Sequence, residues 1–151
     1  MKITKISQKG LDLIKKFEGL RLKPYLCAAG VPTIGYGNTF YENGTKVKLT
    51  DSPITEERAT ELLMHSLTSF EKHVDSYCRD DINQNQFDAL VSFAFNLGPA
   101  NLKNSTLLKK LNVNPSDETI RAEFAKWSKA GGRVLKGLVL RRGAEADLYF
   151  S

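Results

Sequence analysis

The sequence predicts an α+β fold in which a small N-terminal lobe containing β-structure is joined by a long helix to an all-helical C-terminal lobe. Strand-forming and turn-forming residues gather in the first third of the chain, and a long run with helical spacing follows them. The remainder carries only short helical patterns separated by Gly and Pro. We therefore expect one domain over residues 1–151, with a small lobe at about 8–52, a connecting helix at about 56–76 and a helical lobe at about 77–151.

The first predicted element is a short helix from about Gln8 to Phe17. Leu11, Ile14 and Glu18 recur at i, i+3 and i+7, which places the Glu18 carboxylate on the apolar face of that helix. Desolvation penalises the charged form of such a carboxylate, which suits a general acid. From the spacing alone, a glutamate that is solvated or paired with a cation is the commoner case.

A strand and a hairpin are expected next. The residues from Val31 to Tyr36 are strand-like, and Asn43-Gly44 is the strongest two-residue turn signal in the chain. The segment 52–57 reads as an N-cap followed by an acidic first turn. It opens the long helix, whose apolar residues keep helical spacing at Leu62, Leu63, Leu67, Phe70 and Val74.

Four shorter helices are predicted for the C-terminal lobe, at Gln84–Leu97, Thr106–Leu111, Asp117–Ser128 and Val139–Phe150. Gly98-Pro99 should end the first of them, and Gly131-Gly132 the third. The chain has no internal repeat and no flexible linker. We therefore expect the two lobes to fold as one unit with a cleft between them.

The balance of charge favours polyanionic partners. The chain has 22 Lys and Arg against 17 Asp and Glu, a formal charge of +5. Nucleic acid and the anionic bacterial envelope both fit this balance. The basic residues are scattered, and their clusters are no larger than pairs such as Lys15-Lys16, so we expect no nucleic-acid binding.

Cysteine and histidine usage argues against a metal or another cofactor. Cys27 and Cys78 lie 51 positions apart, and His65 and His73 lie eight positions apart, which matches no common ligand spacing. We expect both thiols to be free. The first residues lack the apolar run of a signal peptide, and no stretch approaches the ~20 apolar residues of a membrane span. We therefore expect a chain made in the cytoplasm without a signal peptide.

One motif points to chemistry. Glu18 is followed after eight residues by Cys27 and after five more by Thr33, just ahead of Gly35-Tyr36-Gly37. This stretch resembles the active-site region of the phage-type lysozymes, family twenty-four of the glycoside hydrolases. The resemblance continues in order along nearly the whole chain, through Phe17–Leu22, Pro24–Cys27, Gly30–Thr39, Asn85–Gly98, Ser105–Leu108, Trp127–Gly132, Gly137-Leu138 and Arg141-Arg142.

The family pattern is Glu, then Asp or less often Cys, then Thr, and Glu18, Cys27 and Thr33 match its Cys form. The resemblance implies a lysozyme-like fold and a phage endolysin. Its activity would be an N-acetylmuramidase that hydrolyses the β-1,4 bond between N-acetylmuramic acid and N-acetylglucosamine in peptidoglycan and lyses the host. A lytic transglycosylase and a non-catalytic peptidoglycan-binding protein are the alternatives.

The resemblance also implies a role for each member of the motif. Glu18 would protonate the glycosidic oxygen, and Thr33 would hold the attacking water. Cys27 stands where a carboxylate is commoner, so it is a base, a nucleophile or a spectator. A free thiol has a pKa near about 8.5 and needs a cation or a helix N-terminus to ionise at neutral pH.

Further residues are candidates for binding and tuning. Those expected to line the cleft and offer a ring face or an amide to the sugar are Tyr36, Asn38, Gln86 and Asn96. Asn38 stands where many family members carry a His. The candidates for a cation near Glu18 are Arg133, Arg141 and Arg142. The aromatic residues expected to belong to the core are Phe87, Phe93, Phe95 and Trp127.

The resemblance implies partners as well. Peptidoglycan would be the substrate, and a membrane-permeabilising holin would release the enzyme from the host cytoplasm to the periplasm or cell wall. We expect the protein to be a monomer.

Overall fold

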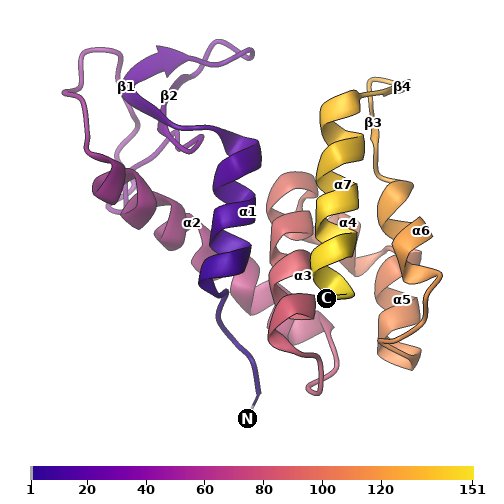
Figure 1. The fold of residues 1–151 in the computed structure, drawn as a ribbon. Coiled ribbons are helices and arrows are strands. Elements are labelled where there is room, and N and C mark those ends of the chain that lie inside the picture. Colours follow the sequence, from indigo (N-terminus) through magenta and orange to yellow (C-terminus); the bar gives the residue numbers. More distant parts are fainter. Residues whose placement is uncertain (1) are drawn as a thin grey trace. The chain divides into compact units, whose positions relative to one another are not determined.

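The computed structural model describes residues 2–151. Over these residues the chain forms seven helices and two small antiparallel sheets, which confirms the predicted α+β class. It divides into two compact units (Figure 1). Glu18–Thr68 is called the β unit, and Met1–Phe17 with Ser69–Ser151 is called the helical unit.

Helix α1 (Gln8–Glu18) was predicted as part of the small lobe, but all of it except Glu18 belongs to the helical unit. Hydrogen bonds explain the difference. The backbone N–H of Ile6 donates to the Glu71 carboxylate at 2.7 Å, and that of Ser7 donates to the Asp88 carboxylate at 3.0 Å. These long-range bonds tie the N-terminal segment to helices that follow much later in the chain, and the helical period alone does not reveal them.

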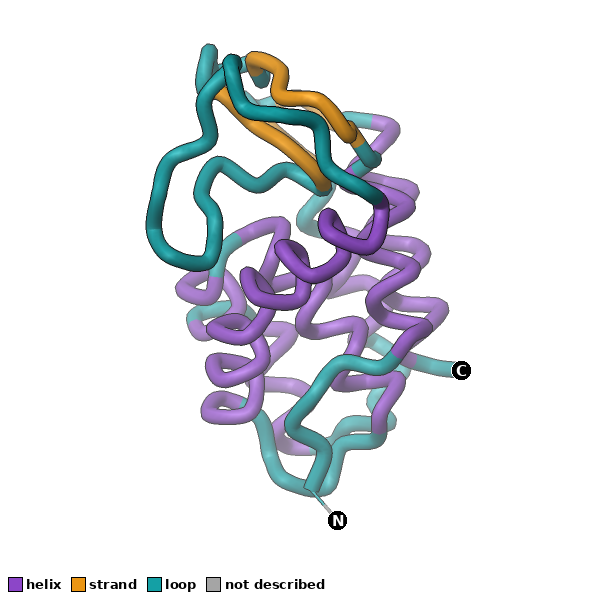
Figure 2. Tube along the Cα trace, turned by 90° about the vertical axis from the view of Figure 1, so that its left-hand side faces the viewer, coloured by secondary structure: helices purple, strands orange, loops and turns teal. Residues whose placement is uncertain are grey.

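The β unit contains the strands β1 (Arg21–Leu26) and β2 (Pro32–Gly35), drawn in orange in Figure 2. They pair antiparallel with Tyr25 opposite Thr33. β2 lies inside the predicted strand. The core of this unit is apolar and includes a cluster of Ile34, Val47 and Leu62, with Tyr41 and Ile54 packed against it.

The Asn43-Gly44 turn forms where the sequence predicts it. Gly44 has φ +86°, and its N–H donates to the carbonyl of Tyr41 at 3.0 Å. The flanking segments do not form a ladder, because they meet only at the single bridge between Phe40 and Lys46.

The long helix is α2 (Glu56–Tyr77), close to its predicted range of about 56–76. The Thr55 hydroxyl accepts a hydrogen bond from the N–H of Arg58 at 3.1 Å and caps the helix. Glu56 and Glu57 lie in the first turn, where carboxylates interact favourably with the positive end of the helix dipole. The border between the two units falls inside α2, after Thr68.

The helical unit continues with α3 (Gln84–Leu97), α4 (Pro99–Lys103), α5 (Thr106–Val113), α6 (Ile120–Ala125) and α7 (Lys136–Tyr149). Helix α7 packs against both α3 and α6 (Figure 1). Helix α3 has its predicted bounds. Helix α6 starts later than predicted because the Asp117 carboxylate accepts bonds from the N–H and the hydroxyl of Thr119, which forms a turn instead of a helical start, and it also ends earlier, at Ala125.

The prediction that the C-terminal lobe is all-helical is wrong in one detail. The strands β3 (Lys129–Ala130) and β4 (Arg133–Val134) form an antiparallel hairpin in the helical unit. Gly131 and Gly132 connect them with φ +58° and +77°, a pair of positive angles that favours glycine in a two-residue turn. A Gly-Gly pair is typical of a helix end and of a hairpin turn alike, so the pair was assigned to a helix end and the hairpin was missed.

Candidate active site

Glu18 is the last residue of α1 and is half-buried. Gly19 follows it with φ +75°, so the helix ends there. A Cβ atom added to Gly37 would lie 3.7 Å from Glu18 Oε1. The carboxylate therefore lies against the glycine-rich turn that follows β2, and the structure brings these two parts of the motif together.

Cys27 begins a tight turn that connects β1 to β2. Its N–H donates to the carbonyl of Val31 at 3.1 Å, and its own carbonyl accepts from the N–H of Gly30 at 2.8 Å. The backbone N–H groups of Val31 and Ala29, followed by the Thr33 hydroxyl, hold the pKa of the Cys27 thiol below its usual range. These donors favour the thiolate. The loop therefore has the effect on the Cys27 thiol that the sequence analysis expected from a cation or a helix N-terminus.

Thr33 lies on β2 and is only 3% exposed. Its hydroxyl donates to the carbonyl oxygen of Val31 at 2.8 Å. A hydroxyl has one proton and two acceptor positions, so donation to Val31 and donation to the Cys27 sulfur are alternatives. In either case the Thr33 oxygen can accept a bond from water.

Two of the predicted sugar-binding residues have structural roles in the β unit. Tyr36 is 4% exposed, so its ring does not present a face for sugar stacking, and that part of the prediction is not supported. The Asn38 amide donates to the Ser66 hydroxyl at 2.8 Å and to the carbonyl of Leu62 at 3.4 Å. Asn38 therefore braces the loop after β2 against α2.

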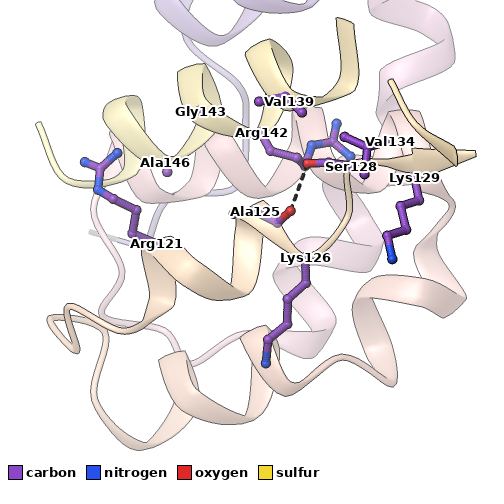
Figure 3. A pocket seen from close by; sticks show the side chains of 10 residues that line it. All are labelled: Arg121, Ala125, Lys126, Ser128, Lys129, Val134, Val139, Arg142, Gly143 and Ala146. Carbon is purple, nitrogen blue, oxygen red and sulfur yellow. Dashed lines mark hydrogen bonds between the residues drawn. The ribbon is translucent and has the colours of Figure 1, made fainter. Parts of the chain in front are cut away.

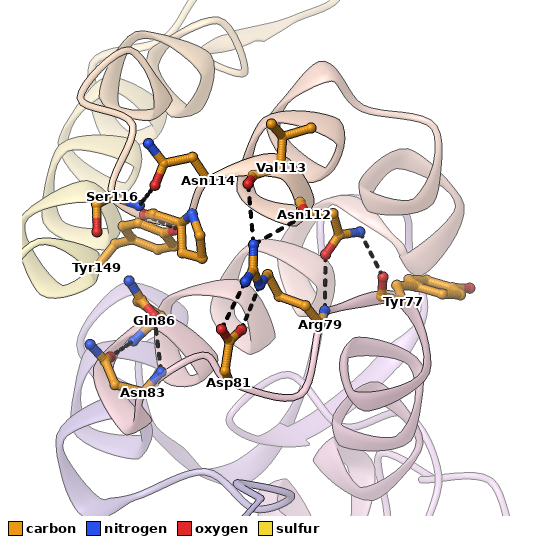
Figure 4. A network of polar contacts seen from close by, with 11 residues as sticks. Tyr77, Arg79, Asp81, Asn83, Gln86, Asn112, Val113, Asn114, Ser116 and Tyr149 are labelled. Carbon is orange, nitrogen blue, oxygen red and sulfur yellow. Dashed lines mark hydrogen bonds and ion pairs between the residues drawn. The ribbon is translucent and has the colours of Figure 1, made fainter.

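Gln86 is occupied at the N-terminus of α3. Its side-chain oxygen accepts from the N–H of Asn83 at 2.9 Å, while the Asn83 side chain accepts from the N–H of Gln86 at 2.8 Å. This capping box lies near the ion pair of Arg79 and Asp81 (Figure 4). Asn96 is ten residues further along, about 15 Å away on the helix axis, so the two amides do not share one subsite.

Asn96 contacts a buried ionic network at the other end of α3. Its side-chain oxygen accepts from Arg142 Nη2 at 2.8 Å, and Arg142 Nε lies 2.7 Å from Glu145 Oε1. The Ser92 hydroxyl donates to Glu145 Oε2 at 2.6 Å. Burial raises the pKa of Glu145 and lowers the pKa of Arg142, while each opposes the shift of the other.

The three candidate cations differ in environment. Arg141 is 3% exposed and contacts both Glu145 and Ser92, with its guanidinium 5.8 Å from the centre of the Phe17 ring. Arg133 is exposed on β4. Arg141 and Arg142 thus have buried structural partners in the helical unit that the sequence analysis did not assign.

The Glu145 network had a signal in the sequence. Glu145 stands four residues after Arg141 and three after Arg142, two spacings that put its side chain within reach of both on a helix. The partner from α3, Ser92, is 53 positions away in the chain and could not be found in this way.

Comparison with known proteins decides the family. The family model described as "Phage lysozyme" matches residues 15–145, most of the chain and the whole of the motif. The chain belongs to the phage lysozyme family. This membership confirms the family and the lysozyme-type enzyme that the sequence predicts.

Phage lysozyme relatives match over nearly all of the chain. The endolysin of Bacillus phage B103 is 45% identical over 97% of this chain, which spans 54% of that protein. The endolysin of Acyrthosiphon pisum secondary endosymbiont phage 1 is also 45% identical, and 98% of it is covered. A crystal structure of a P22 lysozyme variant has a TM-score of 0.89 at 37% identity, covering 99% of this chain and all of that one.

Among residues 2–151, none of the helices combines the length and the apolar character needed to cross a bilayer.

Proposed function

We propose that the protein is an endolysin with N-acetylmuramidase activity, hydrolysing the β-1,4 bond between N-acetylmuramic acid and N-acetylglucosamine in peptidoglycan. The observation that carries this proposal is the arrangement of the β unit. Glu18 lies against the turn at Gly37, and Cys27 and Thr33 belong to the hairpin that leads into that turn.

Glu18 acts as the general acid in this proposal. It donates its proton to the glycosidic oxygen as the bond breaks and an oxocarbenium-like centre forms. Its half-buried position and the close approach of Gly37 leave the carboxyl in partly desolvated surroundings.

Thr33 orients the nucleophile. With its proton on the Val31 carbonyl, the hydroxyl oxygen accepts a hydrogen bond from the attacking water. This directs a lone pair of that water toward the anomeric carbon. The geometry supports a positioning role, because nothing in the reaction requires Thr33 to exchange its proton.

Cys27 takes the place of the second carboxylate. Its lowered thiol pKa supports a thiolate that removes a proton from the water and stabilises the positive charge on the sugar. We propose a single displacement with inversion and no covalent adduct. A spectator thiol would not need the backbone N–H groups of Val31 and Ala29 that the loop directs at the sulfur.

A lytic transglycosylase is the second candidate, and one observation favours it. That reaction needs a single carboxylate, because a hydroxyl of the sugar replaces water, and Cys27 leaves Glu18 as the only carboxylate of the motif. The donors around the Cys27 sulfur argue for hydrolysis instead.

Several further proposals follow from membership of the family. The two units act together as one catalytic domain, and the protein works as a monomer. Asn38, Gln86 and Asn96 affect sugar binding by holding the elements around them in place. The enzyme stays in the host cytoplasm until a holin permeabilises the membrane and gives it access to the wall.

The activity is tested by incubating purified protein with sacculi and assaying new reducing sugar ends together with released free amino groups. Hydrolysis of the glycan produces reducing ends alone. Cleavage of peptides produces amino groups, whereas a transglycosylase, which leaves anhydro ends, and a protein that only binds produce neither. Either of the last two results would refute the proposed activity.

A further inference from the structure

One stretch of the helical unit has an unusual charge pattern. Residues 126–144 contain six Lys and Arg and no Asp or Glu, although the chain as a whole has 17 carboxylates. Arg141 and Arg142 are buried in the Glu145 network. Lys129, Arg133 and Lys136 are exposed, so the surface formed by this stretch is cationic.

The same stretch exposes large apolar side chains. Val134 is 62% exposed, Leu135 43%, Val139 46% and Leu140 55%. Among the described residues of the helical unit, the other strongly exposed large apolar side chain is Val113. The N–H of Val139 donates to the carbonyl of Leu135 at 3.0 Å, so these two residues lie one helical turn apart.

A pocket of about 550 Å³ opens on this surface between α6, β4 and α7 (Figure 3). Val134, Val139 and Ala146 form the apolar part of the pocket wall. The cationic side chains that line it are Arg121, Lys126, Lys129 and Arg142. Arg142 is 1% exposed, and its Nη1 has no hydrogen-bond partner, so the pocket lining includes an unsatisfied donor of a buried cation.

The hairpin β3–β4, Leu135 and residues 136–140 of α7 together are called the basic apolar face. A glycan strand is hydrophilic and binds through hydrogen bonds and aromatic rings, so exposed Val and Leu side chains do not help to hold it. A bilayer surface accepts apolar side chains at the headgroup and acyl boundary, and it accepts Lys and Arg at its phosphates. The absence of carboxylates from the stretch also matches an anionic partner.

We propose that the basic apolar face docks on the surface of an anionic phospholipid bilayer. Leu135, Val139 and Leu140 enter the boundary between headgroups and acyl chains, while Lys129 and Lys136 lie at the phosphates. The contact is interfacial, and no part of the face crosses the bilayer. It is separate from glycan cleavage, so its success or failure does not depend on the proposed muramidase activity.

The test measures binding of the purified protein to sedimented vesicles of phosphatidylglycerol and, separately, of phosphatidylcholine. Trp127 is the single tryptophan of the chain and lies inside the stretch, half-buried with its ring 5.6 Å from that of Phe93. Quenching of its fluorescence by lipids with brominated acyl chains reports whether this face is the one in contact. We expect binding and quenching with the anionic vesicles only.

Two variant pairs separate the contributions. Lys129→Gln with Lys136→Gln should weaken binding about twenty-five-fold, since each cation near an anionic surface contributes about fivefold. Leu135→Ser with Leu140→Gln should weaken it at least about tenfold without a change in charge. Ser at position 135 can cap α7, which has no side-chain cap, so this pair should keep its fold.

Matched controls make the same chemical changes elsewhere. Lys9→Gln with Lys109→Gln removes two exposed cations, and Val113→Ser with Met64→Gln removes two exposed apolar side chains. The proposal requires each control pair to bind nearly as tightly as the unchanged protein.

Three results would overturn the proposal. Equal losses in a test pair and its control would show that net charge or general hydrophobicity drives binding. Absence of Trp127 quenching would place the contact on another face. Weaker binding of the test pairs to sacculi, with unchanged binding to vesicles, would assign the face to the wall polymer.

Discussion

The Thr33 hydroxyl on β2 donates its proton to the carbonyl oxygen of Val31, 2.8 Å away, in the hairpin that also carries Cys27. A water molecule held by Thr33 must therefore donate to it. The second proton of that water is then available to a base, and the thiolate of Cys27 is the candidate base in the same loop. The relationship between these residues underlies the proposed mechanism.

Replacing Thr33 tests the positioning role. Thr33→Val keeps the branched shape but loses both the donor to Val31 and the acceptor for water, so the rate on sacculi should fall about 100-fold. Thr33→Ser keeps the hydroxyl and should retain most of the activity. The comparison is made by turbidity clearance at equal folded concentration. A Thr33→Val enzyme that clears as fast as Thr33→Ser would remove Thr33 from the mechanism.

Glu18→Gln should abolish lysis and leave the fold intact, because an amide of the same shape has no proton to transfer. The expected loss in rate is about 10²–10⁴-fold. Glu61→Gln on the exposed side of α2 is the matched control and should be unaffected. Circular dichroism confirms that both variants are folded. Near-normal clearance by Glu18→Gln would contradict the general-acid assignment.

Cys27 should control the pH dependence of the rate. Because its pKa is lowered, the thiolate forms at a lower pH than that of an ordinary thiol, and the rate should rise with pH through that pKa. Cys27→Asp should stay active and move this limb to lower pH, while Cys27→Ala should be badly impaired.

Alkylation provides the matching control for Cys27. Burial raises the pKa of Cys78 to about 12, so a small alkylating reagent at neutral pH should modify Cys27 first. Inactivation should follow modification of Cys27, and substrate should protect against it. A fully active Cys27→Ala would make the thiol a spectator and favour the transglycosylase.

The pair of Glu42 and Arg58 should contribute stability that depends on pH. The two side chains are 2.5 Å apart, and the Arg58 guanidinium lowers the pKa of Glu42 from 4.5 to about 2. Since the folded-state pKa is the lower one, this stability is present above pH 4.5 and is lost as the pH falls toward 2.

Urea unfolding measures this contribution. Both side chains are about one-third exposed, so Glu42→Gln should cost at most about 1 kcal/mol at pH 7. The difference from the unchanged protein should disappear near pH 2. A difference that stays constant across this range would mean that the pair does not stabilise the fold through its charges.

Helices with local signals could be predicted closely from the sequence. Helix α3 has its predicted bounds because Gly98, with φ +94°, stops it and Asn83 caps its start. The motif of Glu18, Cys27 and Thr33 could be named because its spacing matches the family. These features depend on neighbours in the chain, which a sequence shows directly.

Features that depend on distant residues could not be predicted. The bond of Ser7 with Asp88 places α1 in the helical unit across 81 positions. Asn38 bonds to Ser66 on α2, and Tyr36 is 4% exposed, but neither fact can be read from neighbours in the chain, so both side chains looked available for sugar. Gln86 is different, because an Asn three residues before a Gln is itself a capping signal.

The most direct test of the proposed hydrolysis is a mass spectrum of muropeptides after sacculi are digested in water enriched in heavy oxygen. Hydrolysis by Glu18, Cys27 and Thr33 predicts that each new muramic acid end is reducing and carries one heavy oxygen at its anomeric carbon. Glu18→Gln should produce none of these ends. Anhydro-muramic ends without heavy oxygen would contradict the account and identify a transglycosylase.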